Sequence, residues 1–154
     1  MTNTPDFTIE KIKIATTSSY TGRLFYGPYE KTPEFVSELK EALGREGIYY
    51  EHFPTVSIYY SDPEDTAPEK LTSFHGVSAN NNVAGNEEFG TFDFSTGDYL
   101  AYSTTQPELI WNAFLHIYEH AGKNGISLSE APPVLLSSFE NNQVNFSFYF
   151  KIED

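Results

Sequence analysis

The 154-residue chain contains no cysteine. Disulfide bonds, cysteine-ligated zinc sites and thiol catalysis are therefore excluded. Long apolar runs are also missing, because no stretch approaches the roughly 18 residues that a membrane span needs. Residues 1–6 lack the basic and apolar segments of a secretory leader. We therefore expect a cytoplasmic protein that does not bind membranes.

Basic residues are scarce. Nine Lys and Arg residues stand against 22 Asp and Glu residues, and the formal net charge at pH 7 is −13. Such a negative field repels phosphate backbones, so we expect no direct binding to nucleic acid. It favours cationic ligands or a basic protein partner. For most of the acids, the simpler interpretation is a solvated surface that keeps the protein soluble.

Aromatic residues, in contrast, are abundant. The chain has 13 Phe, 11 Tyr and 1 Trp, which together make up 16% of its residues. Many of these rings must fill the core. Each buried tyrosine hydroxyl needs a hydrogen-bond partner, and a small core has few to offer. The surplus of tyrosines predicts a cleft lined by phenol rings.

A weak internal repeat divides the chain. The pentapeptide Gly-Arg-Glu-Gly-Ile at residues 44–48 recurs as Gly-Lys-Asn-Gly-Ile 78 residues later, at 122–126. Each copy follows an amphipathic segment that predicts a helix, at about 30–43 and 107–121, with a proline in the first turn. Glycines at these points predict a left-handed helix cap and an exit turn.

Alternation and β-propensity predict seven strands around these helices. They cover residues 7–17, 55–60, 71–78, 89–94, 99–104, 134–139 and 144–152. The order strand, helix, strand, strand then occurs twice, within about 7–78 and 88–152, and residues 80–86 form the joining loop. We predict a single α+β domain over 1–154, in which a duplicated βαββ unit forms one antiparallel sheet. Both helices would cover one face, and a ligand cleft would occupy the other.

Four motifs resemble those of one known family. They are Gly-Pro-Tyr-Glu at 27–30, the run from Tyr59 through Val77 with its Tyr-Tyr-Ser-Asp-Pro-Glu start, Gly-Asp-Tyr-Leu-Ala at 97–101, and Ala-Pro-Pro at 131–133. Together they resemble the GyrI-like small-molecule-binding domains, also called the AraC-type effector-binding family. The resemblance covers nearly the whole chain.

The resemblance implies a cleft between the two repeats, walled by aromatic rings and often holding a buried glutamate that pairs with lipophilic cations. This chain departs from the pattern at two places. Ser147 stands where relatives often carry that glutamate, and residues 105–107 are Thr-Gln-Pro instead of Gly-Pro-Tyr. Cation binding would then require another acid, such as Glu140, Asp93 or one on a helix.

Candidate ligand-binding residues follow from strand alternation. On the last strand, Ser147 and Tyr149 point away from Phe146, Phe148 and Phe150, which face the helices. We expect His75 and Ser73 on the equivalent strand of the first repeat to face the same open side. The full candidate set is Tyr59 or Tyr60 (neighbours that alternate), His75, Trp111 at the start of the second helix, Glu140, Ser147 and Tyr149. For each of them, core packing or plain surface exposure is the simpler alternative.

The pattern His-Ile-Tyr-Glu-His at 116–120 matches a zinc-peptidase motif. The polar face of an amphipathic helix explains it more simply, because the first repeat has Glu38 and Ala42 at the two histidine positions. No glycine-rich phosphate loop is present. We therefore expect no metal, no cofactor and no catalytic residue.

The function predicted from the sequence is non-catalytic binding of lipophilic, drug-like molecules in an aromatic cleft, with the resemblance favouring cationic ones. The protein would act as a multidrug sensor or a sequestering protein without its own DNA-binding domain. One alternative is a protein-interaction module like the relatives that inhibit DNA gyrase. The other is a hydrolase of strained electrophiles that uses Glu140 and Tyr149 as acid and base.

Overall fold

The computed structural model describes residues 7–79 and 88–153. These residues form two compact units, which we call unit 1 (residues 7–16 and 96–153) and unit 2 (residues 17–79 and 88–95). The predicted loop at 80–86 and the N-terminal residues 1–6 lie outside the described residues. No helix among the described residues is long and apolar enough to cross a membrane.

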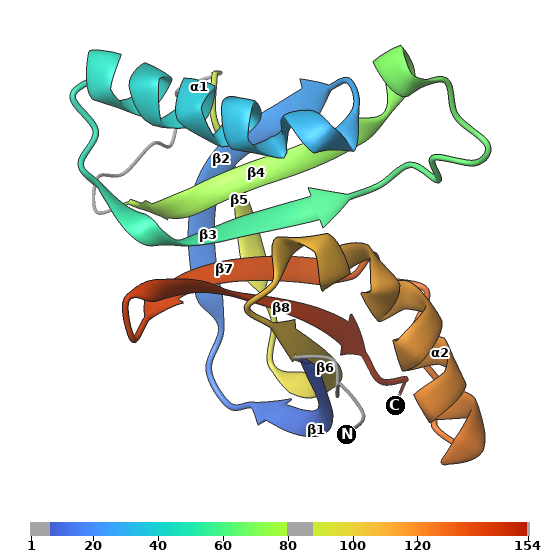
Figure 1. The fold of residues 1–154 in the computed structure, drawn as a ribbon. Helices are drawn as coiled ribbons and strands as arrows, with labels where there is room; N and C mark the ends of the chain where they lie inside the picture. The colour runs from blue at the N-terminus through green and yellow to red at the C-terminus, as the bar shows by residue number, and fades with distance from the viewer. Residues whose placement is uncertain (1–6, 80–87, 154) are drawn as a thin grey trace. The chain divides into compact units, whose positions relative to one another are not determined.

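The antiparallel sheet has eight strands, and unit 2 contributes four of them together with one α-helix (Figure 1). The strand order of unit 2 is β3-β4-β2-β5. In chain order its elements are β2 (Ser18–Tyr26), the short 3-10 helix η1 (Tyr29–Lys31), α1 (Thr32–Arg45), β3 (Tyr50–Tyr59), η2 (Pro68–Lys70), β4 (Thr72–Ala79) and β5 (Gly90–Phe94).

Unit 1 has the same plan. Its antiparallel strands have the order β1-β6-β8-β7. Its elements are β1 (Phe7–Ile14), β6 (Gly97–Thr104), the 3-10 helix η3 (Pro107–Asn112), α2 (Ala113–Lys123), β7 (Val134–Glu140) and β8 (Gln143–Lys151). The βαββ order thus occurs twice, as β2-α1-β3-β4 and as β6-α2-β7-β8, and each unit gains a fourth strand. The predicted α+β class with antiparallel pairing is confirmed.

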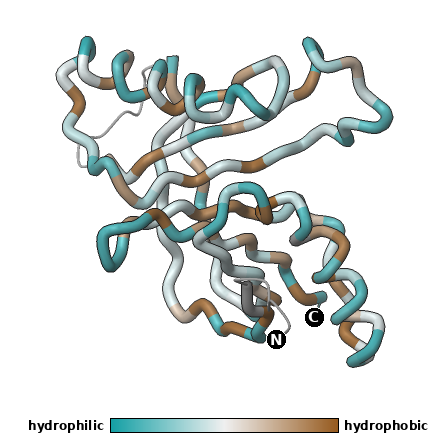
Figure 2. Tube along the Cα trace, in the orientation of Figure 1, coloured by the Kyte–Doolittle hydropathy of each residue, from teal (hydrophilic) through white to brown (hydrophobic). Residues whose placement is uncertain are grey.

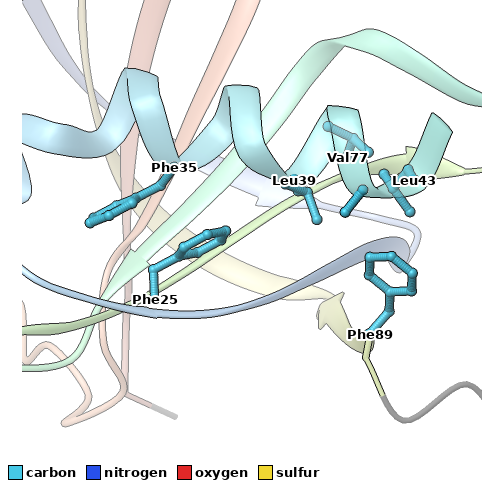
Figure 3. Close-up of a cluster of buried hydrophobic side chains, with 7 residues drawn as sticks. Phe25, Phe35, Leu39, Leu43, Val77 and Phe89 are labelled. Atoms are coloured by element: carbon cyan, nitrogen blue, oxygen red, sulfur yellow. The ribbon is translucent and has the colours of Figure 1, made fainter. Parts of the chain in front are cut away.

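The core of unit 2 lies between α1 and its sheet. Figure 2 shows hydrophilic and hydrophobic residues alternating along α1, as an amphipathic helix requires. Its apolar side buries Phe35, Leu39, Ala42 and Leu43 against Phe25, Val77 and Phe89 (Figure 3). The Phe25 and Phe35 rings stack with their centroids 4.9 Å apart. This burial fixes the face of the sheet that α1 covers.

The core of unit 1 is aromatic, as the three phenylalanines of the last strand predicted. Phe114 of α2 lies 5.3 Å from the Phe148 ring and 5.6 Å from the Phe150 ring. Phe148 and Phe150 are buried, and Ile117 of α2 is fully buried as well. The even-numbered residues of β8 therefore face α2, and the odd-numbered residues face the other side of the sheet.

The two helices end in the same way, which confirms the repeat. The backbone N–H of Ile48 donates to the carbonyl of Leu43 at 2.9 Å, and Ile126 donates to Ala121 at the same distance. Between them, Gly47 and Gly125 have φ angles of 70° and 63°. This left-handed conformation favours glycine, and it closes both helices with the expected cap.

The predicted strand at 7–17 is wrong in two respects. β1 ends at Ile14, and a second strand, β2, begins at Ser18. We did not predict β2 because Ser18, Ser19 and Gly22 have low β-propensity. Gly22 is nevertheless required, because a Cβ atom there would meet the carbonyl oxygen of His75 on β4. β2, not β1, is the first strand of the first repeat.

Two element boundaries also differ from the prediction. β3 begins at Tyr50 instead of residue 55, and its pairing with β4 shifts register between Tyr50 and Thr55. Pro54 lies in that irregular stretch, where a missing N–H is tolerated. In the second repeat, residues 107–112 form the 3-10 helix η3, so the α-helix begins only at Ala113.

Candidate functional site

Two of the motifs meet at the phenol of Tyr29. The Tyr29 hydroxyl donates to the carbonyl of Ser61 at 2.7 Å and accepts from the Ser61 N–H at 3.0 Å. The Ser61 hydroxyl in turn accepts from the N–H of Thr72 at 3.1 Å. Burial raises the pKa of Tyr29, so it stays a neutral phenol. Tyr29 thus fixes both ends of the loop between β3 and β4.

The loop after Ser61 is held by its own acids. The Asp62 carboxylate accepts from the N–H of Glu64 at 2.9 Å, and the N–H of Asp65 donates to the carbonyl of Asp62 at 3.1 Å. These contacts are typical of a turn that begins at an Asp-Pro pair. The Asp-Pro-Glu part of the motif therefore has a structural role in this chain.

His75 lies in a buried polar network under α1. Its Nδ1 atom is 2.7 Å from the Ser57 hydroxyl, and its Nε2 atom is 2.9 Å from the Ser73 hydroxyl. The residue is 0% exposed, with Phe35 of α1 5.7 Å away. Burial lowers the pKa of His75 from its usual 6.5 to about 4, so the ring is neutral at pH 7. The expectation that Ser73 and His75 face an open side is wrong.

Tyr59 and Tyr60 face opposite sides of unit 2, as alternation predicted. Tyr59 shares the α1 side with His75, at 5.9 Å between ring centroids, and its hydroxyl is 2.9 Å from that of Thr32. Tyr60 is 49% exposed on the other side. The structure thus brings Tyr59 and His75 together inside the core and leaves Tyr60 at the surface.

The face of unit 1 opposite α2 carries a different group of side chains. Ser147 pairs with Ser103 of β6, and their hydroxyls are 2.9 Å apart. Tyr149 pairs with Ala101, and its ring is perpendicular to the Tyr99 ring, with 6.2 Å between the two centroids. Ser147 and Tyr149 are both partly exposed. We call this group, on the odd-numbered side of β8, the Tyr149 face.

Two carboxylates act on the Tyr149 phenol. Burial raises the pKa of Tyr149, a hydrogen bond with Ser147 lowers it, and the negative charges of Glu10 and Glu140 raise it further. The register explains the first acid, because Glu10 pairs with Ala101 and Ala101 pairs with Tyr149. Tyr149 is therefore a neutral phenol with negative charge nearby, an arrangement that attracts a cation.

Glu140 and Trp111 occupy different sides of unit 1. Glu140 ends β7 opposite Gln143, so it shares the odd-numbered side of β8 with Ser147 and Tyr149. Trp111 in η3 stacks on Phe114 at 6.1 Å and lies 6.1 Å from Phe148. Trp111 therefore belongs to the α2 side, although it is 44% exposed. Glu140, Ser147 and Tyr149 are thus the candidate residues that share the side of unit 1 opposite α2.

Sequence reasoning missed three members of the Tyr149 face. Tyr99 and Ser103 follow the Gly-Asp start of β6, and strand alternation could have placed them opposite the last strand. Glu10 carried no such signal, because β1 lies outside the βαββ repeat and its pairing with β6 is not visible in the sequence.

The zinc motif does not assemble into a metal site. Among the described residues, no group of three or more His, Asp or Glu side chains is placed to hold a metal ion. The His116 ring stacks on the Tyr102 ring at 6.1 Å with 13° between their planes. His116 therefore packs against the sheet.

An open cavity of about 380 Å³ lies elsewhere on unit 1. It is lined by Lys11, Gly125, Ile126, Ser127, Ile152 and Glu153. It has no aromatic ring, and its one cation and one carboxylate offset each other. We therefore place the candidate site on the Tyr149 face, where aromatic rings and carboxylates come together.

Comparison with known proteins supports a ligand-binding fold. The family model of the GyrI-like small molecule binding domain matches residues 24–135. No curated protein matches the chain in sequence. The three solved structures described next share at most 12% sequence identity with this chain, so their similarity shows the fold alone.

The cryo-EM structure of the EcmrR–DNA complex has a TM-score of 0.76 at 9% identity, over 97% of this chain and 58% of that chain. The chain thus spans little more than half of that EcmrR protein. The EcmrR C-terminal domain has a TM-score of 0.70 at 12% identity, over 96% and 98% of the two chains. SAV2435 bound to tetraphenylphosphonium has a TM-score of 0.53 at 6% identity, over 95% and 94%. With a family match that covers most of its length, this chain belongs to the GyrI-like small-molecule-binding domains.

Proposed function

We propose that the protein binds lipophilic, cationic aromatic molecules at the Tyr149 face, as a cytoplasmic sensor or sequestering protein. The observation that carries this proposal is the partly buried Tyr149 phenol, with the Tyr99 ring against it and the charges of Glu10 and Glu140 acting on it. Aromatic rings attract cations through their faces, and carboxylates attract them through charge.

Glu10 and Glu140 supply the negative charge that Ser147 lacks. A serine at that position cannot pair with a cation by charge. The charges of Glu10 on β1 and Glu140 on β7 act on Tyr149 from the two strands that flank the β6-β8 pair. Each ring contact with a cation contributes about 0.5 to 2 kcal/mol. Two carboxylates beside such a ring would restore the preference for cations.

The comparisons agree with this ligand class. The family is defined by small-molecule binding, and one structural neighbour, SAV2435, holds tetraphenylphosphonium, which is an aromatic phosphonium cation. The net charge of −13 supports the same preference, and it disfavours direct contact with nucleic acid. A basic protein partner, the gyrase-inhibitor-like module and the hydrolase stay predictions.

The experiment is a pair of thermal-shift and calorimetric titrations. Tetraphenylphosphonium is the cationic probe, and triphenylphosphine oxide is the neutral aromatic control. A ligand at about 100 times its dissociation constant adds roughly 2.7 kcal/mol to the free energy of unfolding. We expect a melting shift of a few degrees for the cation and a much smaller one for the oxide.

Three variants locate the site. Glu10→Gln and Glu140→Gln should each weaken binding of the cation and leave binding of the neutral probe unchanged. Tyr149→Leu should weaken binding of both probes. Glu108→Gln removes one carboxylate from η3 on the α2 side, so it is the charge-matched control. Equal shifts for the two probes, or equal effects of Glu108→Gln and Glu10→Gln, would contradict the proposal.

A further inference from the structure

Lys151 places a cation on the Tyr149 face. It is the last residue of β8 and pairs directly with Tyr99 of β6, so both side chains lie on the same side of the sheet. The Lys151 ammonium lies 5.4 Å from the centroid of the Tyr99 ring. A cation within about 6 Å of a ring centroid makes a favourable cation–π contact. The chain itself therefore supplies a cation to one of the two tyrosine rings of the site.

The position of this ammonium is built into the turn before β6. The Lys151 Nζ atom donates to the carbonyl of Thr96 at 3.0 Å. A Cβ atom at Gly97 would lie 2.8 Å from Nζ, so any larger residue would displace the ammonium. The φ angle of Gly97 is 141°, which other residues rarely adopt. The hydrogen bond thus holds the Lys151 ammonium over Tyr99, and Gly97 leaves the space that it occupies.

The consequence for a ligand is competition. Tyr99 is only 4% exposed, with Lys151 over its ring and the Tyr149 ring perpendicular to it. A ligand cation can contact the Tyr99 ring only if the Lys151 ammonium moves away. While Lys151 stays in place, the two positive charges repel each other. Apolar area on the ligand offsets that cost, because burial of apolar surface is favourable in itself.

We propose that Lys151 is a specificity-determining residue, a resident cation that competes with ligand cations for the Tyr99 ring. The inference rests on the function proposed above. Small hydrophilic cations, such as tetramethylammonium, bring too little apolar area to displace Lys151. Large lipophilic cations bring enough. Lys151 therefore filters cations by their lipophilicity.

A purely structural role for Lys151 makes a different prediction. If the ammonium only secures the end of β8 to the turn, its loss should lower stability and leave ligand selectivity unchanged. Lys151→Met keeps the apolar stem and removes the charge. Lys151→Arg keeps a cation above the ring.

Lys13→Met is the matched control. It removes the same charge from the same sheet, but Lys13 pairs with Asp98 on the side that faces α2. It therefore reports what the change in net charge does on its own.

The test is calorimetric titration of the full chain and the three variants with tetraphenylphosphonium, tetramethylammonium and triphenylphosphine oxide. We expect Lys151→Met to bind tetraphenylphosphonium about three- to tenfold more tightly, as loss of one cation–π contact and one like charge implies. It should also gain measurable affinity for tetramethylammonium. The neutral oxide should change by less than about twofold, and Lys151→Arg and Lys13→Met should resemble the wild type.

The outcomes separate the two proposals. If wild type and Lys151→Met bind tetraphenylphosphonium equally, and that binding is lost in Tyr149→Leu, the resident-cation role is overturned and the proposed function stands. If Lys151→Met alone binds the cations, the competition is stronger than expected and the inference is supported. If no variant binds any cation, both proposals are overturned. Melting temperatures measured without ligand confirm that each variant is folded.

Discussion

Acidification should destabilise the protein through one buried ring, that of His75. Its pKa is about 4 in the folded protein, whereas an exposed histidine has a pKa near 6.5. Between these values the unfolded chain binds more protons than the folded one. The free energy of unfolding therefore rises with pH through this window and falls as the pH drops below about 6.5.

The magnitude follows from the two pKa values. Each unit of difference corresponds to about 1.36 kcal/mol, so the full effect approaches about 3 kcal/mol well below pH 4. At pH 4.5 the expected loss relative to pH 7 is about 2 kcal/mol. Solvent screening does not reduce this figure, because His75 is 0% exposed.

The assay is urea unfolding at pH 7, 6, 5 and 4.5 for the wild type and for His75→Gln, which offers an amide to the two serines in place of the ring. The wild type should lose about 2 kcal/mol more than His75→Gln between pH 7 and pH 4.5. His52→Gln is the control, because His52 is exposed on β3 of the same unit. The reasoning is refuted if the wild type and His75→Gln lose stability in parallel.

Two further predictions concern the scaffold of unit 2. Tyr29→Phe removes the hydroxyl that holds both backbone groups of Ser61, so unfolding by urea should become easier by about 1–3 kcal/mol, whereas Tyr26→Phe at the 64% exposed neighbour should change little. Leu39→Ala opens a cavity under α1 where the side chain is 0% exposed, and calorimetry should give a loss of about 2–5 kcal/mol. The same substitution at Leu115, which is 62% exposed on α2, should cost far less; similar losses at both leucines would contradict the assigned core.

The parts of the fold that were predictable share a strong local signal. Phe148 and Phe150 alternate with polar residues on β8, so their side of the sheet followed from the period alone. The helix ends followed from Gly47 and Gly125, because few other residues adopt their backbone conformation. β2 had no comparable signal. Gly22 and two serines have low β-propensity, and the strand forms because it pairs with β4.

The candidate site was harder to predict, because polarity is a poor guide to exposure on β4. Ser73 and His75 are polar residues on the buried side of their strand. The His75 ring forms hydrogen bonds with the hydroxyls of Ser57 and Ser73, so these polar groups have partners without contact with solvent. The rule that polar residues point to solvent therefore fails there. Glu10 was hard to predict for a different reason. Its approach to Tyr149 depends on a pairing between β1 and β6 that joins distant parts of the chain.

The interleaved order of the two units has a consequence for synthesis. Unit 2 is a continuous segment, whereas unit 1 joins residues from both ends of the chain. We expect unit 2 to fold first as the chain emerges, since its own strands and helix are close together in sequence. β1 must wait unpaired until β6 is made, and during that time it resembles an aggregation-prone strand. Its Glu10, Lys11 and Lys13 put a charge at three of its eight positions and so protect the nascent chain.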